Sequence, residues 1–266
     1  MQMVTGFSSM KTSMRVATAQ FPVSGNAARN FKYIRQQMIQ AVAQNAHIVL
    51  FPETALPGYG PKHMNALENY DWLTLQSYTE HICELAQHYS LWVVLGSMRR
   101  EIDELPLNCL HVISNTGALV DTYGKRMLYD KEKAIYSPGF SPLIVDIYGH
   151  RCGFLICYDN CFPELYEEYR DEGVGLIFHA FHNAGNDHAT DIAKLMRANL
   201  RVRAADNQMS IAASNSSSRY SALAACVVRP DGYIVATKRH RASIAIDTFP
   251  APDLGWTYDN RSIVIL

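Results

Sequence analysis

The sequence has no apolar run close to the roughly 20 residues that a membrane span needs. Its first residues, MQMVTGFSSMKTSMRV, also lack the apolar centre of a signal peptide. Charge of neither sign is in excess, because 24 lysines and arginines are matched by 25 aspartates and glutamates along the chain. Without a basic run, neither nucleic acid nor a membrane surface is an expected partner. These absences favour a cytoplasmic protein that acts on a small molecule.

The cysteines are too few and too scattered for a disulfide framework. In a chain of 266 residues they stand at positions 83, 109, 152, 157, 161 and 226. This usage is typical of intracellular proteins with free thiols. Most of the six are expected to fill the core, since an unreactive cysteine behaves as a small buried hydrophobe.

No linker, low-complexity tract or block of charge divides the chain, and 48% of its residues are hydrophobic. We therefore expect one domain over residues 14–266, with residues 1–13 as a disordered extension to which we assign no function. Apolar or β-rich runs at 14–21 and 47–51 flank a stretch with helical periodicity, which indicates a β-α-β unit. Further helices are predicted at 64–90, 163–173 and 187–206, and hairpin turns at 115–117 and 230–232. Alternating elements predict an α/β layered fold, and the hairpins predict a mixed sheet.

A carboxylate follows the first buried run, in the stretch LFPETALPGYG. Glu53 stands where the expected strand passes into a loop that holds Pro57, Gly58 and Gly60. In open α/β sheets, ligands bind at this carboxyl end of the strands. Glu53 is therefore a candidate functional residue, and ordinary exposed loop polarity is the simpler alternative.

A second candidate is the polar segment YGKRMLYDKEKAIYSPGF, residues 123–140, which lies between two pairs of expected strands. It holds Lys125 and Glu132 among other charged side chains. A run of charges is usually a solvated surface. A connection of this length with little regular structure, however, is more often a functional loop than a tight turn.

The third candidate is GFLICYDNCFPELYEE, residues 153–168, where two cysteines flank the join between a strand and a helix. Cys157 ends the strand, and Pro163 sets the first helical turn. Unpaired N–H groups at such a place favour a thiolate and can bind an oxyanion. Cys161 lies nearer the helix and has less reason to be exposed. Burial of both thiols as core filler is the alternative.

Taken together, the three candidates supply the parts of a nucleophilic site. A thiol needs a base that takes its proton and returns it to a leaving amine, and a carboxylate in a dry pocket does both. A carbonyl oxygen that becomes negative needs N–H groups or a cation, and a lysine ammonium provides one. Cys157, Glu53 and Lys125 meet these requirements.

These stretches resemble the glutamate, lysine and cysteine motifs of the nitrilase superfamily of carbon-nitrogen hydrolases. The matching sequences follow the order of that family over about residues 14–250: VATAQFPV, FPE with PGYG, the GK of YGKRML, EKAIYSPG, ICYDNCFPE, RVRAADNQMSIAASN and VVRPDGYIVA. The resemblance implies an α/β fold that is a four-layer α-β-β-α sandwich with mixed sheets. It also implies a homodimer or higher homo-oligomer, because two such units commonly pair so that their layers continue across the interface.

The resemblance further implies a role for each candidate. Cys157 would attack an amide or nitrile carbon, Glu53 would act as general base, and Lys125 would stabilise the tetrahedral intermediate. Glu132 would position the substrate or assist proton transfer, and the backbone N–H of Tyr158 would complete the oxyanion site. A thioester would form and water would hydrolyse it, without any metal or organic cofactor. The expected partner is a small-molecule amide or carbamoyl substrate.

Substrate contacts are expected from the loops around these residues. Tyr59 follows Glu53, and His182 and Asn183 follow a buried strand on the same side of the sheet. Ordinary loop polarity is the alternative for the last two. Met127 stands where many family members have histidine, and HAFHNAGNDH stands where proline and tryptophan are frequent. The pair Tyr158-Asp159, in place of the Trp-Glu of true nitrilases, resembles the amidase and carbamoylase branches.

Two alternative interpretations use different chemistry. His179, His182 and His188 with the two thiols 157 and 161 supply the ligand types that zinc prefers, but residues three apart on a strand face opposite sides. A redox pair of the two thiols would need their Cα atoms within about 7 Å. A non-catalytic binding protein of the same fold is the third alternative, and the presence of all three motif residues argues against it. A nitrile-hydrolysing enzyme remains an alternative within the superfamily.

Overall fold

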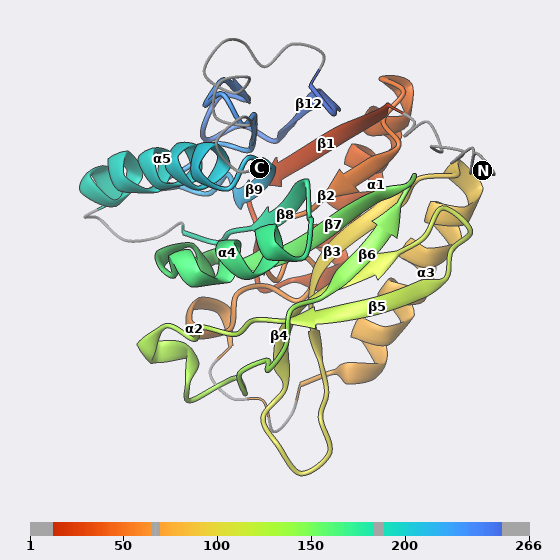
Figure 1. Ribbon diagram of the computed structural model, residues 1–266. Coiled ribbons are helices and arrows are strands. Elements are labelled where there is room, and N and C mark those ends of the chain that lie inside the picture. Colours follow the sequence, from red (N-terminus) through yellow and green to blue (C-terminus); the bar gives the residue numbers. More distant parts are fainter. Residues whose placement is uncertain (1–12, 65–66, 68–69, 184–188, 252–266) are drawn as a thin grey trace, which may run out of the picture.

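The structure is a computed structural model, and it describes residues 13–64, 67, 70–183 and 189–251, with the side chains of 189–193 excepted. The extension expected at 1–13 lies outside the described residues except for its last residue. The remainder forms an α/β fold in which helices cover both outer faces of two packed sheets (Figure 1).

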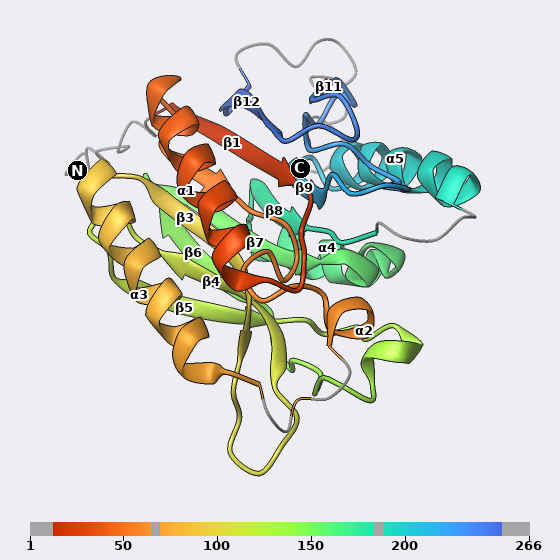
Figure 2. The same cartoon turned by 180° about the vertical axis from the view of Figure 1, so that it is seen from behind.

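The first half of the chain builds one sheet with helices on its outer face. The elements are β1 (Met14–Phe21), α1 (Ala27–Ala43), β2 (Ile48–Leu50), α2 (Gly60–His63), α3 (Trp72–Tyr89), β3 (Trp92–Arg99), β4 (Leu107–Ile113) and β5 (Leu119–Gly124). Strands β1, β2 and β3 are parallel, while β4 and β5 return as an antiparallel meander. Helices α1 and α3 lie side by side across the outer face (Figure 2).

The second half builds the other sheet on the same plan. Its elements are β6 (Ile144–Ile147), β7 (His150–Ile156), α4 (Pro163–Asp171), β8 (Leu176–Ala180), α5 (Ala189–Asp206), β9 (Ser210–Ser216), β10 (Cys226–Val228), β11 (Ile234–Ala236) and β12 (Ser243–Phe249). Strands β7, β8 and β9 are parallel, and β12 pairs antiparallel with β1.

A short parallel pairing of β1 with β9 joins the two halves, so that the hydrogen bonds run through one curled sheet. Residues of both halves, among them Val16, Leu50, Phe154 and Phe178, pack in the core that also receives α4 and α5. A second core lies between α1, α3 and the first sheet. The order α, β, β, α confirms the predicted layered sandwich with a mixed sheet.

The local sequence explains where the helices begin. Asn26 and Asp71 each accept a hydrogen bond from a backbone N–H in the first turn of α1 and α3, and Pro163 occupies the first turn of α4. The helix predicted at 64–90 therefore starts only at Trp72, because Asp71 caps it there. The turn at 115–117 is confirmed by Gly117, whose φ of +80° suits glycine.

Strand direction decides where the candidate residues meet. Strands β7, β8, β9, β1, β2 and β3 all run the same way, and β5 joins them because two antiparallel steps separate it from β3. Their carboxyl ends therefore lie at one edge of the sheets. The loops that leave β2, β5, β7 and β8 begin at this edge.

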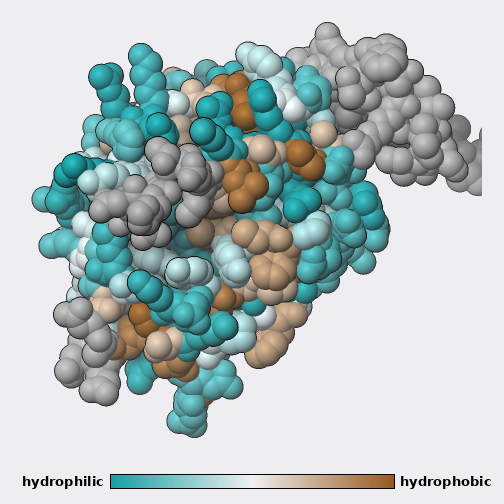
Figure 3. Space-filling view, turned by 90° about the vertical axis from the view of Figure 1, so that its left-hand side faces the viewer, coloured by the Kyte–Doolittle hydropathy of each residue, from teal (hydrophilic) through white to brown (hydrophobic). Residues whose placement is uncertain are grey.

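The described surface is mixed in character. Figure 3 shows one face, on which hydrophobic residues gather in small groups between hydrophilic ones. None of the helices within the described ranges has the length and apolar character that crossing a membrane requires.

Candidate active site

Glu53 lies three residues after the end of β2 and is fully buried, so its interpretation as exposed loop polarity is wrong. Its backbone N–H donates to the carbonyl of Phe181 over 3.3 Å. Its Oε1 accepts from Asn108 Nδ2 and from Lys125 Nζ, each at 2.7 Å. Its Oε2 is buried without a hydrogen-bond partner among the described residues. One carboxylate oxygen is therefore held in place, and the other is left to accept a proton.

Lys125 follows β5 and is 1% exposed. Its Nζ donates to Glu53 Oε1 and to Glu132 Oε1, each over 2.7 Å. Burial alone would lower the pKa of Lys125, but the negative charges of Glu53, Cys157 and Glu132 outweigh burial and raise that pKa above its ordinary value. The side chain is therefore an ammonium in the resting site.

Glu132 is also fully buried, in a 3₁₀ turn at Asp130–Glu132. Its Oε2 accepts from the backbone N–H of Tyr129 at 2.7 Å. Burial and the charge of Glu53 raise the pKa of Glu132, while the Lys125 ammonium opposes that rise. The polar segment 123–140 is therefore not a solvated run of charges at Lys125 and Glu132, because it places an ammonium and a carboxyl group in the interior.

Cys157 is half-buried immediately after β7 and takes a φ of +45°, a left-handed conformation that is costly for a residue with a Cβ. Burial raises the pKa of its thiol well above the ordinary range, and the carboxylates of Glu53 and Glu132 raise it further. Lys125 and the backbone N–H of His182 act in the opposite direction. The expectation that the helix start favours a thiolate is therefore not met, because burial and two buried carboxylates outweigh the nearby donors.

The four residues lie within electrostatic reach of one another. Glu53, Lys125 and Glu132 each act on the Cys157 thiol, and three of the four side chains form a hydrogen-bonded row. A thiol, a carboxylate with one oxygen unpaired among the described residues and an ammonium thus lie together at this edge of the sheets. This arrangement suits nucleophilic attack on a carbonyl, with proton transfer to the carboxylate.

Asn108 and Asp159 also belong to the site, although neither was a candidate for a role in it from the sequence. Asn108 begins β4 and fixes Glu53. Asp159 is fully buried, and it accepts from Tyr123 Oη, from the backbone N–H of Ile156 and from that of Met127 over 2.8 to 2.9 Å. Asp159 therefore ties the end of β7, which carries Cys157, to the loop that carries Lys125. The position of Asp159 two residues after the thiol was the available signal.

We expect Asp159→Asn to lower both stability and turnover. An amide keeps one acceptor oxygen and directs an NH₂ group at the donors of the other, so at least one buried N–H or O–H loses its partner, at a cost of about 1–3 kcal/mol. Urea unfolding and kcat measure the two effects. Asp171→Asn is the matched control, because this exposed aspartate bonds only its neighbour Arg170. Equal behaviour of the two variants would contradict the positioning role.

An aromatic group lines the same edge. The ring of His182 stacks on that of Tyr59 with centroids 4.7 Å apart, and His63 meets it edge-on at 5.8 Å. Burial lowers the pKa of His182 to about 3, so its imidazole is neutral. Burial raises the pKa of Tyr59, as do the charges of Glu53 and Glu132, so its phenol stays protonated. Both ring nitrogens of His182 lack partners among the described residues.

Asn183 and Tyr158 are placed differently. The Asn183 side-chain oxygen accepts from Asn215 Nδ2 at 2.6 Å, while its own Nδ2 is buried without a partner among the described residues. Tyr158 follows Cys157 with a 37% exposed ring and lies edge-on to Tyr129. The structure thus gathers all four expected contact residues around the Cys157 loop or the strand end beside it.

The groups considered for zinc have other neighbours. His179 lies within β8, and its Nδ1 is 2.9 Å from Tyr166 Oη in a hydrogen bond. His182 lies beyond the end of that strand, and its ring stacks on Tyr59. His188 lies outside the described residues. Both Cys157 and Cys161 are free thiols, and Cys161 is exposed, which corrects the expectation that it would be the less exposed of the two. Cys161 is the last residue of the 3₁₀ turn Cys157–Cys161, which precedes α4 in the chain.

The fold and this constellation define an α-β-β-α sandwich protein whose site holds a thiol, a carboxylate and an ammonium. A family model described as carbon-nitrogen hydrolase matches residues 15–255. The chain belongs to the carbon-nitrogen hydrolase family, which confirms the resemblance to the nitrilase superfamily.

Individual relatives agree with this assignment. Omega-amidase NIT2 of Homo sapiens is 29% identical over 219 residues, which cover 77% of this chain and 75% of that protein. A deaminated glutathione amidase of Yersinia enterocolitica is 27% identical over 223 residues, covering 78% and 74%. The crystal structure of an amidase from Nesterenkonia sp. covers 95% of both chains with a TM-score of 0.78 at 22% identity, which shows the same fold.

Proposed function

We propose that this enzyme hydrolyses a linear amide or an N-carbamoyl compound through an acyl-enzyme on Cys157. The observation that carries the proposal is the carboxylate of Glu53, which is anchored by Lys125 and Asn108 through one oxygen, has its other oxygen unpaired among the described residues, and acts through its charge on the Cys157 thiol. Two relatives named as amidases, together with the Tyr158-Asp159 pair, favour an amide over a nitrile.

In the first half of the reaction, the Cys157 sulfur attacks the amide carbon and Glu53 takes the thiol proton. The carbonyl oxygen becomes negative, and the Lys125 ammonium and the backbone N–H of Tyr158 stabilise it. Glu53 then gives its proton to the leaving nitrogen. The carbon–nitrogen bond breaks, ammonia or an amine departs, and a thioester remains.

In the second half, Glu53 takes a proton from water, and the hydroxide so formed attacks the thioester carbon. The same oxyanion contacts act again. The carbon–sulfur bond breaks, the proton returns to sulfur, and a carboxylic acid leaves. Glu132 holds the Lys125 ammonium in line between the two carboxylates. Tyr59, His182 and Asn183 contact the substrate with neutral polar groups.

Trapping the intermediate tests this function directly. Incubation with a panel of short aliphatic amides and N-carbamoyl amino acids, followed by acid quench and peptide mass analysis, should show an added acyl mass on the Cys157 peptide. Ammonia release should follow the same substrates. An enzyme and a Cys157→Ala variant that are equally silent across the panel would instead favour a binding protein.

The pH profile of kcat/KM should rise with pH on its acid limb and then stay level between pH 7 and 9. Burial and the charge of Glu53 raise the pKa of Glu132, so the acid limb should lie above the usual value of about 4.3. The level part follows because Glu53 takes the thiol proton during attack, and no prior ionisation of the thiol is needed. Glu132→Gln should move the limb to lower pH, because it removes the carboxyl group whose pKa is raised. A tenfold rise per pH unit from 7 to 9 would contradict this, because it would mark a thiolate formed in advance.

We also propose that two copies pair through α5. Leu195 and Val202 lie seven residues apart on α5 and are 58% and 48% exposed. Sedimentation velocity should give a dimer for the wild type and a lighter species for Leu195→Glu, whereas the same dimer in both would exclude this face. A cytoplasmic location is in keeping with six free thiols.

A further inference from the structure

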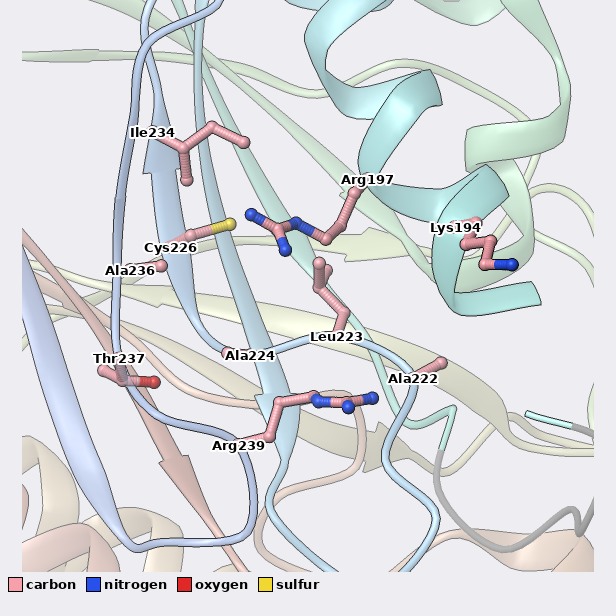
Figure 4. A pocket seen from close by; sticks show the side chains of 10 residues that line it. All are labelled: Lys194, Arg197, Ala222, Leu223, Ala224, Cys226, Ile234, Ala236, Thr237 and Arg239. Atoms are coloured by element: carbon pink, nitrogen blue, oxygen red, sulfur yellow. The ribbon is translucent and has the colours of Figure 1, made fainter. Parts of the chain in front are cut away.

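A cavity of about 460 Å³ lies apart from the Cys157 site, between α5 and the strands β10 and β11 (Figure 4). Its inner wall is apolar and includes Leu223, Cys226 and Ile234. Three cationic side chains stand around it, Lys194 and Arg197 from α5 and Arg239 from the loop after β11. No residue of the catalytic row lines this cavity.

The charged side chains that line the cavity are all cationic. From 207 to 249 the chain carries five lysines or arginines and two acids, Asp231 and Asp247. Asp247 pairs with Arg229, and the Asp231 Oδ1 accepts from the backbone N–H of Tyr233 at 2.8 Å in the β10–β11 turn. Helix α5 adds four basic residues between the acids near its two ends, Asp191 and Asp206. In a chain of net charge -1, this is a local concentration of positive charge.

The cations lack protein counter-charges. Within the described part of the chain, no ion pair involves Lys194, Arg197 or Arg239. Arg239 donates to the carbonyl of Ser221 over 3.3 Å. Figure 4 shows the Arg197 side chain extending from α5 toward Cys226. Its charge opposes the effect of burial, which raises the pKa of the Cys226 thiol to about 12.

We propose that this cavity is a second ligand site, which binds a small carboxylate that carries a compact apolar group. The arginine guanidinium groups match the two oxygens of a carboxylate, and the apolar wall accepts the rest of the molecule. A fully hydrated anion such as phosphate would leave that wall uncovered and would lose water without compensation. The site is independent of the hydrolase proposal, because it shares no residue with the catalytic row.

Isothermal titration calorimetry with the full-length chain and benzoate tests the site. We expect saturable binding that weakens as salt is raised, because the contacting charges are near the surface. Arg197→Gln and Arg239→Gln should each weaken benzoate binding about tenfold, the loss expected for one charge-assisted contact. Arg201→Gln is the matched control, since it removes a cation from the same helix outside the cavity. Ala236→Glu, which places a carboxylate among the cations, should abolish binding.

Four results would overturn the proposal. One is the absence of benzoate binding at millimolar concentration, and another is benzoate binding that both arginine variants leave unchanged. Equal binding of benzyl alcohol would show that the charge is not recognised, and equal binding of inorganic phosphate would exclude the apolar component. Thermal unfolding of each variant establishes that it is folded. Benzoate bound at the Cys157 site alone would leave the arginine variants unaffected and so counts against the cavity.

Discussion

Turnover should fall by about 10⁶-fold when Cys157 is replaced by alanine, the loss typical of removing a catalytic nucleophile. No other thiol can take its place, because Cys157 directly follows β7 and its thiol lies within electrostatic reach of Glu53, Lys125 and Glu132. Ammonia release from the best amide of the panel measures the change. Binding of that amide should persist, since the substitution removes no charge from the pocket.

Cys161→Ser supplies the control within the same turn. Cys161 lies four residues further on and is exposed. Its partial burial raises the pKa of its thiol, and the charge of Arg203 opposes that rise. We expect the variant to keep most of the wild-type turnover. Equal loss in the two variants, with both folded by circular dichroism, would refute the assignment of separate roles to the two cysteines.

The meeting of the catalytic residues could be predicted from the sequence because it follows from strand direction. Glu53, Lys125 and Cys157 each stand one to three residues beyond a strand, and the carboxyl ends of parallel strands share one edge. The motif order identified the family, and hydrophobic periodicity located most of the helices. Helix α3 begins later than periodicity indicated, since a capping aspartate outweighs the apolar residues before it.

The supporting residues could not be predicted, because their roles depend on partners far away in the chain. Asn108 reaches Glu53 across 55 positions, and Asp159 reaches Tyr123 across 36. Neither contact leaves a local pattern. The protonation state of the Cys157 thiol could not be predicted from the sequence either. The nearby helix start predicts a low pKa, and only the three-dimensional arrangement shows that burial and two carboxylates raise it. Exposure of Cys161 follows from the 3₁₀ turn before α4, which the sequence pattern did not reveal.

The second large effect is expected from Lys125→Ala, which should remove both activity and stability. The ammonium lies between two buried carboxylates, 2.7 Å from each, so its loss leaves their negative charges facing each other without a cation. Breaking a buried ion pair from one side costs about 3–5 kcal/mol. The oxyanion also loses a charged partner, which lowers turnover by a factor of about 10³. Urea unfolding at pH 7.5 and ammonia release measure the two losses.

Arg126→Ala separates this effect from the removal of any cation in the loop. Arg126 pairs with Glu168, and both side chains are partly exposed, so this variant should lose less than about 1 kcal/mol. Stability changes of equal size in the two variants would contradict a special role for the buried row.

The pH dependence of the Lys125→Ala variant identifies the cause of its instability. Burial and the charge of Glu53 already raise the pKa of Glu132, and without the ammonium nothing opposes that rise in the folded state. The folded variant then binds more protons than the unfolded one, so its free energy of unfolding falls as pH rises from about 4.3 through the raised pKa of Glu132. Relative to wild type, the variant should therefore lose least near pH 5 and most near pH 8. Adding Glu132→Gln should recover part of the loss at pH 8, because one of the two facing charges is gone. A deficit that is independent of pH and unaffected by Glu132→Gln would indicate lost packing instead of uncompensated charge.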